Sequence, residues 1–226
     1  MCYSTESSLY TSAVSFVAIV YLLSSGIPHF QWLGVSLTGW CAMQFAEFLL
    51  WSENPREQCT DTNKLVTATV VSAALFLQGV SAMLGAFFVY PASVLKPYAV
   101  GSLAVSAATV YAMHFYNADK MCSVVTKEGH LNWSRRLDWS VASPAEITFG
   151  YYYWAFIIFA PLLFLWNRSL PFLAIFLILP AVGFFYGRYG TDSGASIWCY
   201  YTSWSSAIAA FGLFLKQAGL YDVLRA

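Results

Sequence analysis

Seven apolar segments, each long enough to cross a lipid bilayer as a helix, constrain the fold of this 226-residue chain more than any other feature. Nearly all of the charged residues lie between these segments rather than inside them. A membrane-spanning helix needs about 20 predominantly apolar residues, and every backbone polar group inside lipid must find its partner within the protein. The apolar runs therefore predict helices at residues 9–25, 32–51, 65–90, 97–116, 147–166, 170–187 and 196–217.

The composition agrees with a membrane protein. Hydrophobic residues make up 59% of the chain, charged residues make up 10%, and the mean hydropathy is +0.60, whereas about 25% of the residues in soluble domains are charged. The runs are too long and too uniformly apolar for the alternating strands of a membrane β-barrel. We therefore predict an all-α seven-transmembrane-helix bundle, a single polytopic membrane domain over residues 1–226.

The charge balance bears on the partners. A formal net charge of +0 gives no basic surface of the kind that binds nucleic acid. The lipid bilayer is therefore the first partner that we expect, and the sequence leaves an oligomer open. The opening residues, Met1 to Glu6, lack the positive charge of a signal peptide, and no cleavage site follows the first apolar run. We expect that run to be retained as the first span.

Seven spans put the two ends of the chain on opposite sides of the membrane. Segment 117–146, after the fourth span, is the connection long enough to fold by itself. β-Branched and apolar residues flank Glu128-Gly129, a pattern that predicts a short β-hairpin between Cys122 and Ser134. We interpret segment 117–146 as a folded extramembrane loop that covers the N-terminal side of the bundle. A passive surface loop is the alternative.

Two sequence signals disagree about the orientation. Lys and Arg are more numerous on the N-terminal side, which favours a cytosolic N-terminus by the positive-inside rule. Most cysteines fall on or near the same side, as expected if it faces an oxidising compartment, and a glycosylation sequon begins there at Asn132. Because many of the basic residues belong to one loop rich in acids, we expect an extracytosolic N-terminus and a cytosolic C-terminus.

These cysteines also predict two disulfides. We expect Cys59 to pair with Cys122, because both lie in loops, and Cys2 to pair with Cys199 at the mouth of the seventh span. Four cysteines allow three pairings, so the sequence leaves the connectivity open.

Glu47 is the most informative residue inside a predicted span. A carboxylate in a membrane helix is costly, and such residues usually face the bundle interior and mark a ligand site, an ion path or a proton relay. Trp40, Gln44, Glu47 and Trp51 follow an i, i+4, i+7, i+11 spacing and form one stripe of the helix. We predict that this stripe faces protein and that Glu47 contacts polar groups of a neighbouring span. A purely structural hydrogen bond, or extension to the membrane interface, is the alternative.

Other polar residues at similar depth predict a pocket that opens toward the N-terminal side. Its predicted ligand-binding residues are Glu47, Gln44, Gln78, His114, Trp51, Glu146 and Arg188, with Tyr residues 151 to 153 closing it. Gln78 is the deepest polar candidate, so we expect the pocket to be sealed toward the C-terminal side. The three histidines show no metal-ligand spacing, so no metal site is predicted, and no cofactor can be assigned.

Short motifs run through most of the chain. They are Met1-Cys2-Tyr3-Ser4, Met43-Gln44-Phe45-Ala46-Glu47, Gln58-Cys59, Gln78, Cys122-Ser123, Gly129-His130-Leu131 with Trp133, and Ser196-Ile197-Trp198-Cys199. In these motifs the chain resembles a family of uncharacterised multi-pass membrane proteins of bacteria, algae and algal viruses, whose members begin Met-Cys-(Trp/Phe/Tyr)-Ser. The resemblance implies a seven-helix fold and a common site near the N-terminal side, without an established activity. Relatives carry a His one helical turn before the third-span glutamine, where this chain has Ala74, and that departure weakens any metal site carried over.

Three functional hypotheses follow. The leading one is a multi-pass membrane protein that binds or passes a small ligand or ion, with Glu47 as its charged element. The second is an intramembrane enzyme that uses Glu47 and His114 as acid and base. The third is a structural subunit of a membrane complex or a viral envelope. The sequence contains no nucleophile elbow and no glycine-rich phosphate loop that would support an enzyme.

Overall fold

The structure is a computed structural model, and it describes residues 4–55, 59–115, 122–127, 129–133 and 194–220. Several predicted features lie outside the described residues. They are Cys2, the side chain of His114, the spans predicted at 147–166 and 170–187, and the pocket residues Glu146, Tyr151 to Tyr153 and Arg188.

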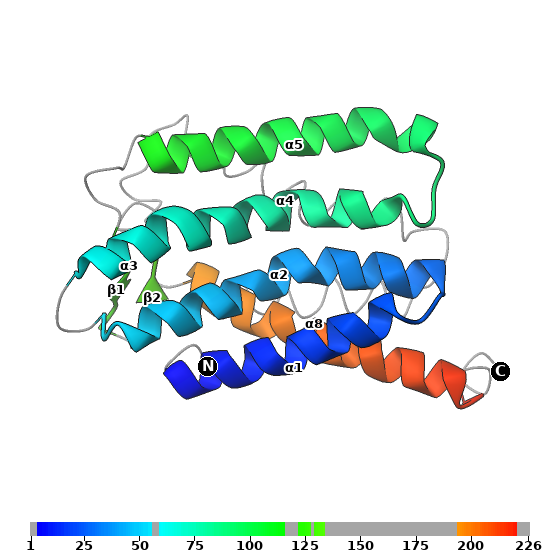
Figure 1. The fold of residues 1–226 in the computed structure, drawn as a ribbon, viewed down its shortest axis with the longest axis horizontal. Coiled ribbons are helices and arrows are strands. Elements are labelled where there is room, and N and C mark those ends of the chain that lie inside the picture. The colour runs from blue at the N-terminus through cyan, green and yellow to red at the C-terminus, as the bar shows by residue number, and fades with distance from the viewer. Residues whose placement is uncertain (1–3, 56–58, 116–121, 128, 134–193, 221–226) are drawn as a thin grey trace.

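Helices make up most of the described residues (Figure 1). They are α1 (Thr5–Leu23), α2 (Pro28–Ser52), α3 (Asp61–Val66), the π-helical segment η1 (Thr67–Val71), α4 (Ser72–Ala86), α5 (Ala92–Phe115) and α8 (Gly194–Gln217). α3, η1 and α4 follow one another without a break and form one continuous helix. The long helices lie side by side, with α2 between α4 on one side and α1 and α8 on the other.

Three of the described helices are long and apolar enough to cross a membrane, namely Thr5–Leu23, Pro28–Ser52 and Asp61–Ala86. The 25 residues of α2 span roughly 37 Å at the helical rise of 1.5 Å per residue, more than the hydrocarbon core of about 30 Å. Large apolar side chains also face outward from α1, α5 and α8. These are features of a helical membrane protein, and the complete set of seven spans stays a prediction.

The starts of two helices follow capping residues. The Ser4 hydroxyl accepts a hydrogen bond from the backbone N–H of Ser7 at 3.2 Å and so caps α1. Thr60 caps α3 in the same way, with the N–H of Asn63 at 3.0 Å. This cap explains why the third span starts at Asp61 and not at residue 65 as predicted.

α5 starts at Ala92, before the predicted residue 97. Pro97, the first residue of the predicted span, lies inside α5. A proline close to a helix start removes only one intrahelical hydrogen bond, so a helix in apolar surroundings can continue through it.

α2 and α4 approach each other closely. A Cβ atom at Gly39 would lie 2.5 Å from a backbone carbonyl oxygen of α4, so a larger residue would force the helices apart. The Ser81 hydroxyl donates a hydrogen bond to the carbonyl of Ser36 at 2.9 Å, and the indole N–H of Trp32 donates to the carbonyl of Ala82 at 2.9 Å. Small residues and hydrogen bonds from side chain to backbone are the usual means by which membrane helices associate.

α8 packs against both α1 and α2. The carbonyl of Ser203 accepts a hydrogen bond from Ser15 Oγ of α1 at 3.3 Å and one from Cys41 Sγ of α2 at 3.8 Å. Closer to the start of α8, the rings of Trp198 and Trp40 pack with their centroids 5.4 Å apart. α2 therefore packs against α1, α4 and α8, whereas α5 packs against α4.

We expect Gly39→Ala to lower the free energy of unfolding by about 1–3 kcal/mol, because the new methyl group overpacks the contact between α2 and α4. The measurement is denaturant or thermal unfolding of the full chain in one detergent, monitored by far-UV circular dichroism.

Gly34→Ala is the matched control on the same helix. A Cβ at position 34 would first meet the end of the Leu23 side chain, at 3.0 Å, and a side chain can move more easily than a backbone carbonyl. Gly34→Ala should therefore cost less stability than Gly39→Ala. A Gly39→Ala variant as stable as the wild type would contradict this account of the interface.

Candidate functional site

Glu47 lies on α2, about one turn before the helix ends at Ser52, and its side chain is completely buried. Ser196 Oγ of α8 donates a hydrogen bond to Glu47 Oε1 at 2.6 Å, and Trp133 Nε1 donates to the same oxygen at 3.2 Å. Gln44 Nε2, one turn earlier on α2, donates to Oε2 at 3.1 Å. The carboxylate thus joins α2, α8 and the segment that carries Trp133.

The prediction that Glu47 points into the bundle and meets a polar group of the last helix is confirmed. The predicted stripe of α2 is buried along its length, since Trp40, Gln44 and Glu47 are at most 1% exposed and Trp51 is 8% exposed. Hydrogen bonds to a charged group contribute about 1.5–3 kcal/mol each and offset part of the cost of burying a carboxylate. That Glu47 binds a ligand stays a prediction.

A β-hairpin lies at one end of the bundle (Figure 1), and Trp133, which directly follows its second strand, donates to Glu47. β1 (Val124–Val125) and β2 (Leu131–Asn132) pair antiparallel, with Val124 opposite Asn132 and Val125 opposite Leu131. The connection contains Gly129 with a φ of +83°, a left-handed conformation that glycine adopts without strain. The predicted β-hairpin is confirmed, and its buried residues Leu131 and Trp133 belong to the same core as the helices.

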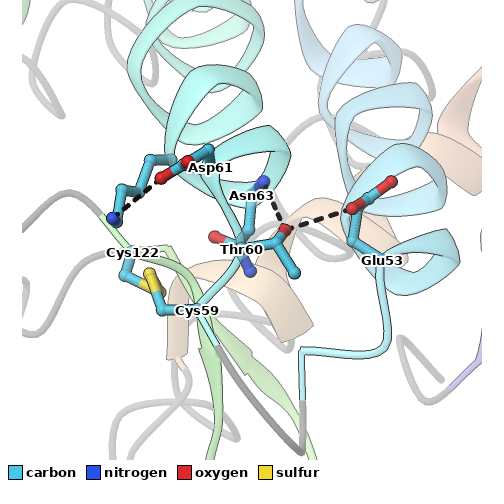
Figure 2. Close-up of polar contacts among 7 residues, drawn as sticks. Glu53, Cys59, Thr60, Asp61, Asn63 and Cys122 are labelled. Atoms are coloured by element: carbon cyan, nitrogen blue, oxygen red, sulfur yellow. Dashed lines mark hydrogen bonds and ion pairs between the residues drawn. A yellow bond between two sulfur atoms is a disulfide. The ribbon is translucent and has the colours of Figure 1, made fainter.

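Two sets of contacts attach the start of the hairpin to the start of α3 (Figure 2). Cys59 and Cys122 form a disulfide with their Cα atoms 6.0 Å apart, which confirms that predicted pair. Asn63 bonds the backbone of Ser123 at both ends of its amide, because Asn63 Nδ2 donates to the Ser123 carbonyl and the Ser123 N–H donates to Asn63 Oδ1, each at 2.9 Å. The hydroxyl of Thr67, in η1, lies 2.8 Å from the Ser123 hydroxyl.

The turn between α2 and α3 is tied to the same region. The Thr60 hydroxyl that caps α3 also donates to Glu53 Oε2 at 3.1 Å, so it links the ends of the two helices (Figure 2). On the outer surface, Lys64 pairs with Asp61 at 3.1 Å. An exposed pair of this kind contributes little to stability. The buried amide and the disulfide are therefore the main attachments of the hairpin to α3.

Gln78 of α4 reaches this region through α8. Gln78 Nε2 lies 3.3 Å from Cys199 Sγ and donates a hydrogen bond to it. Cys199 follows Ser196, which donates to Glu47, by about one turn of α8. Of the predicted pocket residues, Gln44 and Glu47 contact each other directly, whereas Gln78 contacts Cys199.

The predicted disulfide between Cys2 and Cys199 is wrong, because Cys199 is a free thiol buried inside the bundle. α8 begins at Gly194, earlier than the predicted residue 196, so Cys199 lies in the second turn of the helix and not at its mouth. There it faces the amide of Gln78 on α4.

Buried hydroxyls continue along α8 beyond Cys199. Ser203 lies one turn beyond Cys199, and both Ser203 and its partner Ser15 are buried. Serine and threonine hydroxyls in helices are commonly satisfied by backbone carbonyls, as the Thr202 hydroxyl is by the carbonyl of Trp198 at 2.9 Å. That the pocket is sealed toward the C-terminal side stays a prediction.

Three residues of the site were not predicted from the sequence as site residues. Ser196 and Trp133 occur in the motifs that carry the family resemblance, which was the one signal available for them. Asn63 has no such signal, because an asparagine in the first turn of a helix is normally a capping or surface residue. Its role depends on the hairpin that folds back onto it.

The remaining predicted residues stand as follows. Trp51 is buried one turn beyond Glu47 on α2, and Asn132 is half-buried in β2, where its glycosylation stays a prediction. Within the described ranges, no three His, Cys, Asp or Glu side chains lie close enough together to hold a metal ion.

Comparison of the chain with models of known protein families, with curated proteins and with solved structures gives no match. The family resemblance therefore rests on its short motifs and stays a prediction. Residues of those motifs meet in the structure, including Glu47, Gln78, Trp133 and Ser196.

We expect a proteolytic digest of the unreduced, alkylated protein to contain one peptide pair joined through Cys59 and Cys122. Cys41 and Cys199 should be alkylated as free thiols once the protein is denatured, because both are unbonded and buried. Mass spectrometry before and after reduction measures both results. A peptide that joins Cys199 to another cysteine would contradict this assignment.

Proposed function

We propose that this chain is a multi-pass integral membrane protein that binds a small ligand or ion at Glu47, at the end of the bundle that carries the hairpin. One observation supports the proposal most strongly. A fully buried carboxylate lies within a candidate span and accepts hydrogen bonds from Gln44, Trp133 and Ser196. Ionisable residues at such positions mark ligand sites, ion paths or proton relays.

The chemistry of the site favours a cation or a proton as the ligand. Carboxylate oxygens are preferred ligands of hard cations. The Ser196 hydroxyl, 2.6 Å from Glu47 Oε1, can either donate to an ionised carboxylate or accept from a protonated one. The same partners can therefore satisfy Glu47 in both charge states, which a binding and release cycle needs.

A structural role is the rival with the most support, because the three donors come from separate segments and hold them together. In that case Glu47 stabilises the bundle and binds nothing. An intramembrane enzyme that uses Glu47 and His114 as acid and base stays a hypothesis, since the side chain of His114 lies outside the described residues.

For the orientation, we propose that the hairpin end of the bundle faces an extracytosolic compartment and that the end of α8 faces the cytosol. The disulfide between Cys59 and Cys122 supports this, because disulfides persist in oxidising compartments. Cys59 is exposed at that end, so a reducing cytosol would reach it.

The test is thermal unfolding of the full chain in lipid nanodiscs, with and without saturating sodium, potassium, magnesium or calcium, and over a series of pH values. A ligand that binds only the folded state stabilises it by about 2.7 kcal/mol at a hundredfold excess over Kd. We expect at least one cation, or a change of pH, to raise the Tm of the wild type and to leave the Tm of Glu47→Gln unchanged.

Glu53→Gln is the matched control, because Glu53 directly follows the same helix, is half-buried, and its carboxylate bonds only the Thr60 hydroxyl among the contacts described. It should respond as the wild type does. Equal responses from the wild type and Glu47→Gln would contradict the proposal. A lower Tm for Glu47→Gln, with no response from any of the proteins, would favour the structural role.

A further inference from the structure

We propose that Asn63 is a positioning residue for the Glu47 site, because it fixes Ser123 and thereby sets the place of Trp133, which orients the Glu47 carboxylate. The inference rests on the proposed function of Glu47. It adds to that site a residue that does not itself contact Glu47 in any described interaction.

Asn63 is built into its position from both sides. Its side chain has no exposed surface, and its own backbone N–H is held by the Thr60 cap. Its amide exchanges two hydrogen bonds with the backbone of Ser123, one through each end. In an antiparallel sheet, a residue of the neighbouring strand would exchange the same pair of bonds with Ser123. The Asn63 side chain therefore takes the place of a strand beside the start of the hairpin.

Ser123 transmits this position to Trp133. The hydroxyl of the fully buried Ser123 lies between Thr67 Oγ1, at 2.8 Å, and the carbonyl oxygen of Trp133, at 3.4 Å. The disulfide at Cys122 holds the adjacent residue. The backbone at both ends of the hairpin is therefore fixed to α3 and η1 through one residue.

Trp133 completes the link. Its side chain is 2% exposed, and its indole N–H donates to Glu47 Oε1. An indole ring is rigid beyond its two side-chain torsions, so its donor follows the backbone to which it is attached. A displacement at Ser123 should therefore change the length of the hydrogen bond at the carboxylate.

Among the common substitutions, Asn63→Asp tests this chain of contacts most specifically. Aspartate has nearly the same size and shape and can still accept from the Ser123 N–H, but as a carboxylate it cannot donate to the Ser123 carbonyl. The substitution should shift the hairpin without opening a cavity. Asp61→Asn is the matched control in the same helical turn, since Asp61 is exposed and pairs with Lys64 on the surface.

The experiment is an NMR spectrum of the full chain in detergent micelles with 15N-labelled tryptophan, read at the indole N–H signals of the nine tryptophans. Trp133→Phe identifies the Trp133 signal. We expect Glu47→Gln and Asn63→Asp each to shift that signal, and Asp61→Asn to leave it in place. The signal of Trp32, identified by Trp32→Phe, should not move in any of them, because Trp32 bonds the carbonyl of Ala82 in another part of the bundle.

An unmoved Trp133 signal in Asn63→Asp would overturn the proposal, and so would one that fails to respond to Glu47→Gln. If Asn63→Asp also displaces the Trp32 signal, the variant has perturbed the whole fold, and Thr67→Val decides instead. That substitution removes the hydroxyl partner of Ser123, and a Trp133 signal that stays in place would again overturn the proposal. The spectra need no ligand, so they can succeed or fail independently of the cation and pH responses that test the proposed function.

Discussion

A carboxylate without exposed surface needs hydrogen-bond donors, and this requirement organises one end of the molecule. Glu47 obtains its donors from Gln44, Trp133 and Ser196, which belong to parts of the chain far apart in sequence. These hydrogen bonds hold the start of α8 and the end of the hairpin against α2. If Glu47 became apolar, these donors would lose their common acceptor together. Among the described residues, Glu47 is the one buried carboxylate, and its hydrogen bonds join α2, α8 and the segment that carries Trp133.

The hairpin depends on the bundle for its order. Each of its strands has two residues, and an isolated two-stranded hairpin is at best marginally stable in water. Its stability comes from the disulfide to Cys59, from the Asn63 amide and from burial of Leu131 and Trp133. A disulfide reduces the conformational entropy of the unfolded chain. The buried Asn63 amide instead fixes the position of Ser123 in the folded chain. Contacts at the surface and at Glu47 therefore meet in one short segment, which both sets of contacts stabilise.

The sequence predicted what depends on composition and local pattern. Apolar runs placed α1, α2 and α8 within a few residues, the cost of a buried charge singled out Glu47, and Gly129 marked the hairpin turn. The sequence could not predict contacts that depend on how one helix is placed against another. Cys199 was expected at a helix mouth and faces α4 instead, because α8 starts two residues earlier than predicted and places Cys199 in its second turn, inside the bundle. Asn63 was missed because its partner is the backbone of Ser123, 60 residues away in the sequence, and no local pattern indicates that contact.

The hydrogen bond between Trp133 and Glu47 couples the hairpin to the bundle, and a double-mutant cycle measures this coupling. The free energy of unfolding in detergent is measured for the wild type, Glu47→Met, Trp133→Phe and the double variant. Methionine keeps the length of the side chain and removes the charge, whereas phenylalanine keeps most of the ring and removes the donor. We predict a coupling free energy of about 1–3 kcal/mol, the range for residues in direct contact and for hydrogen bonds to charged groups. Additive effects, with a coupling free energy indistinguishable from zero, would contradict the account.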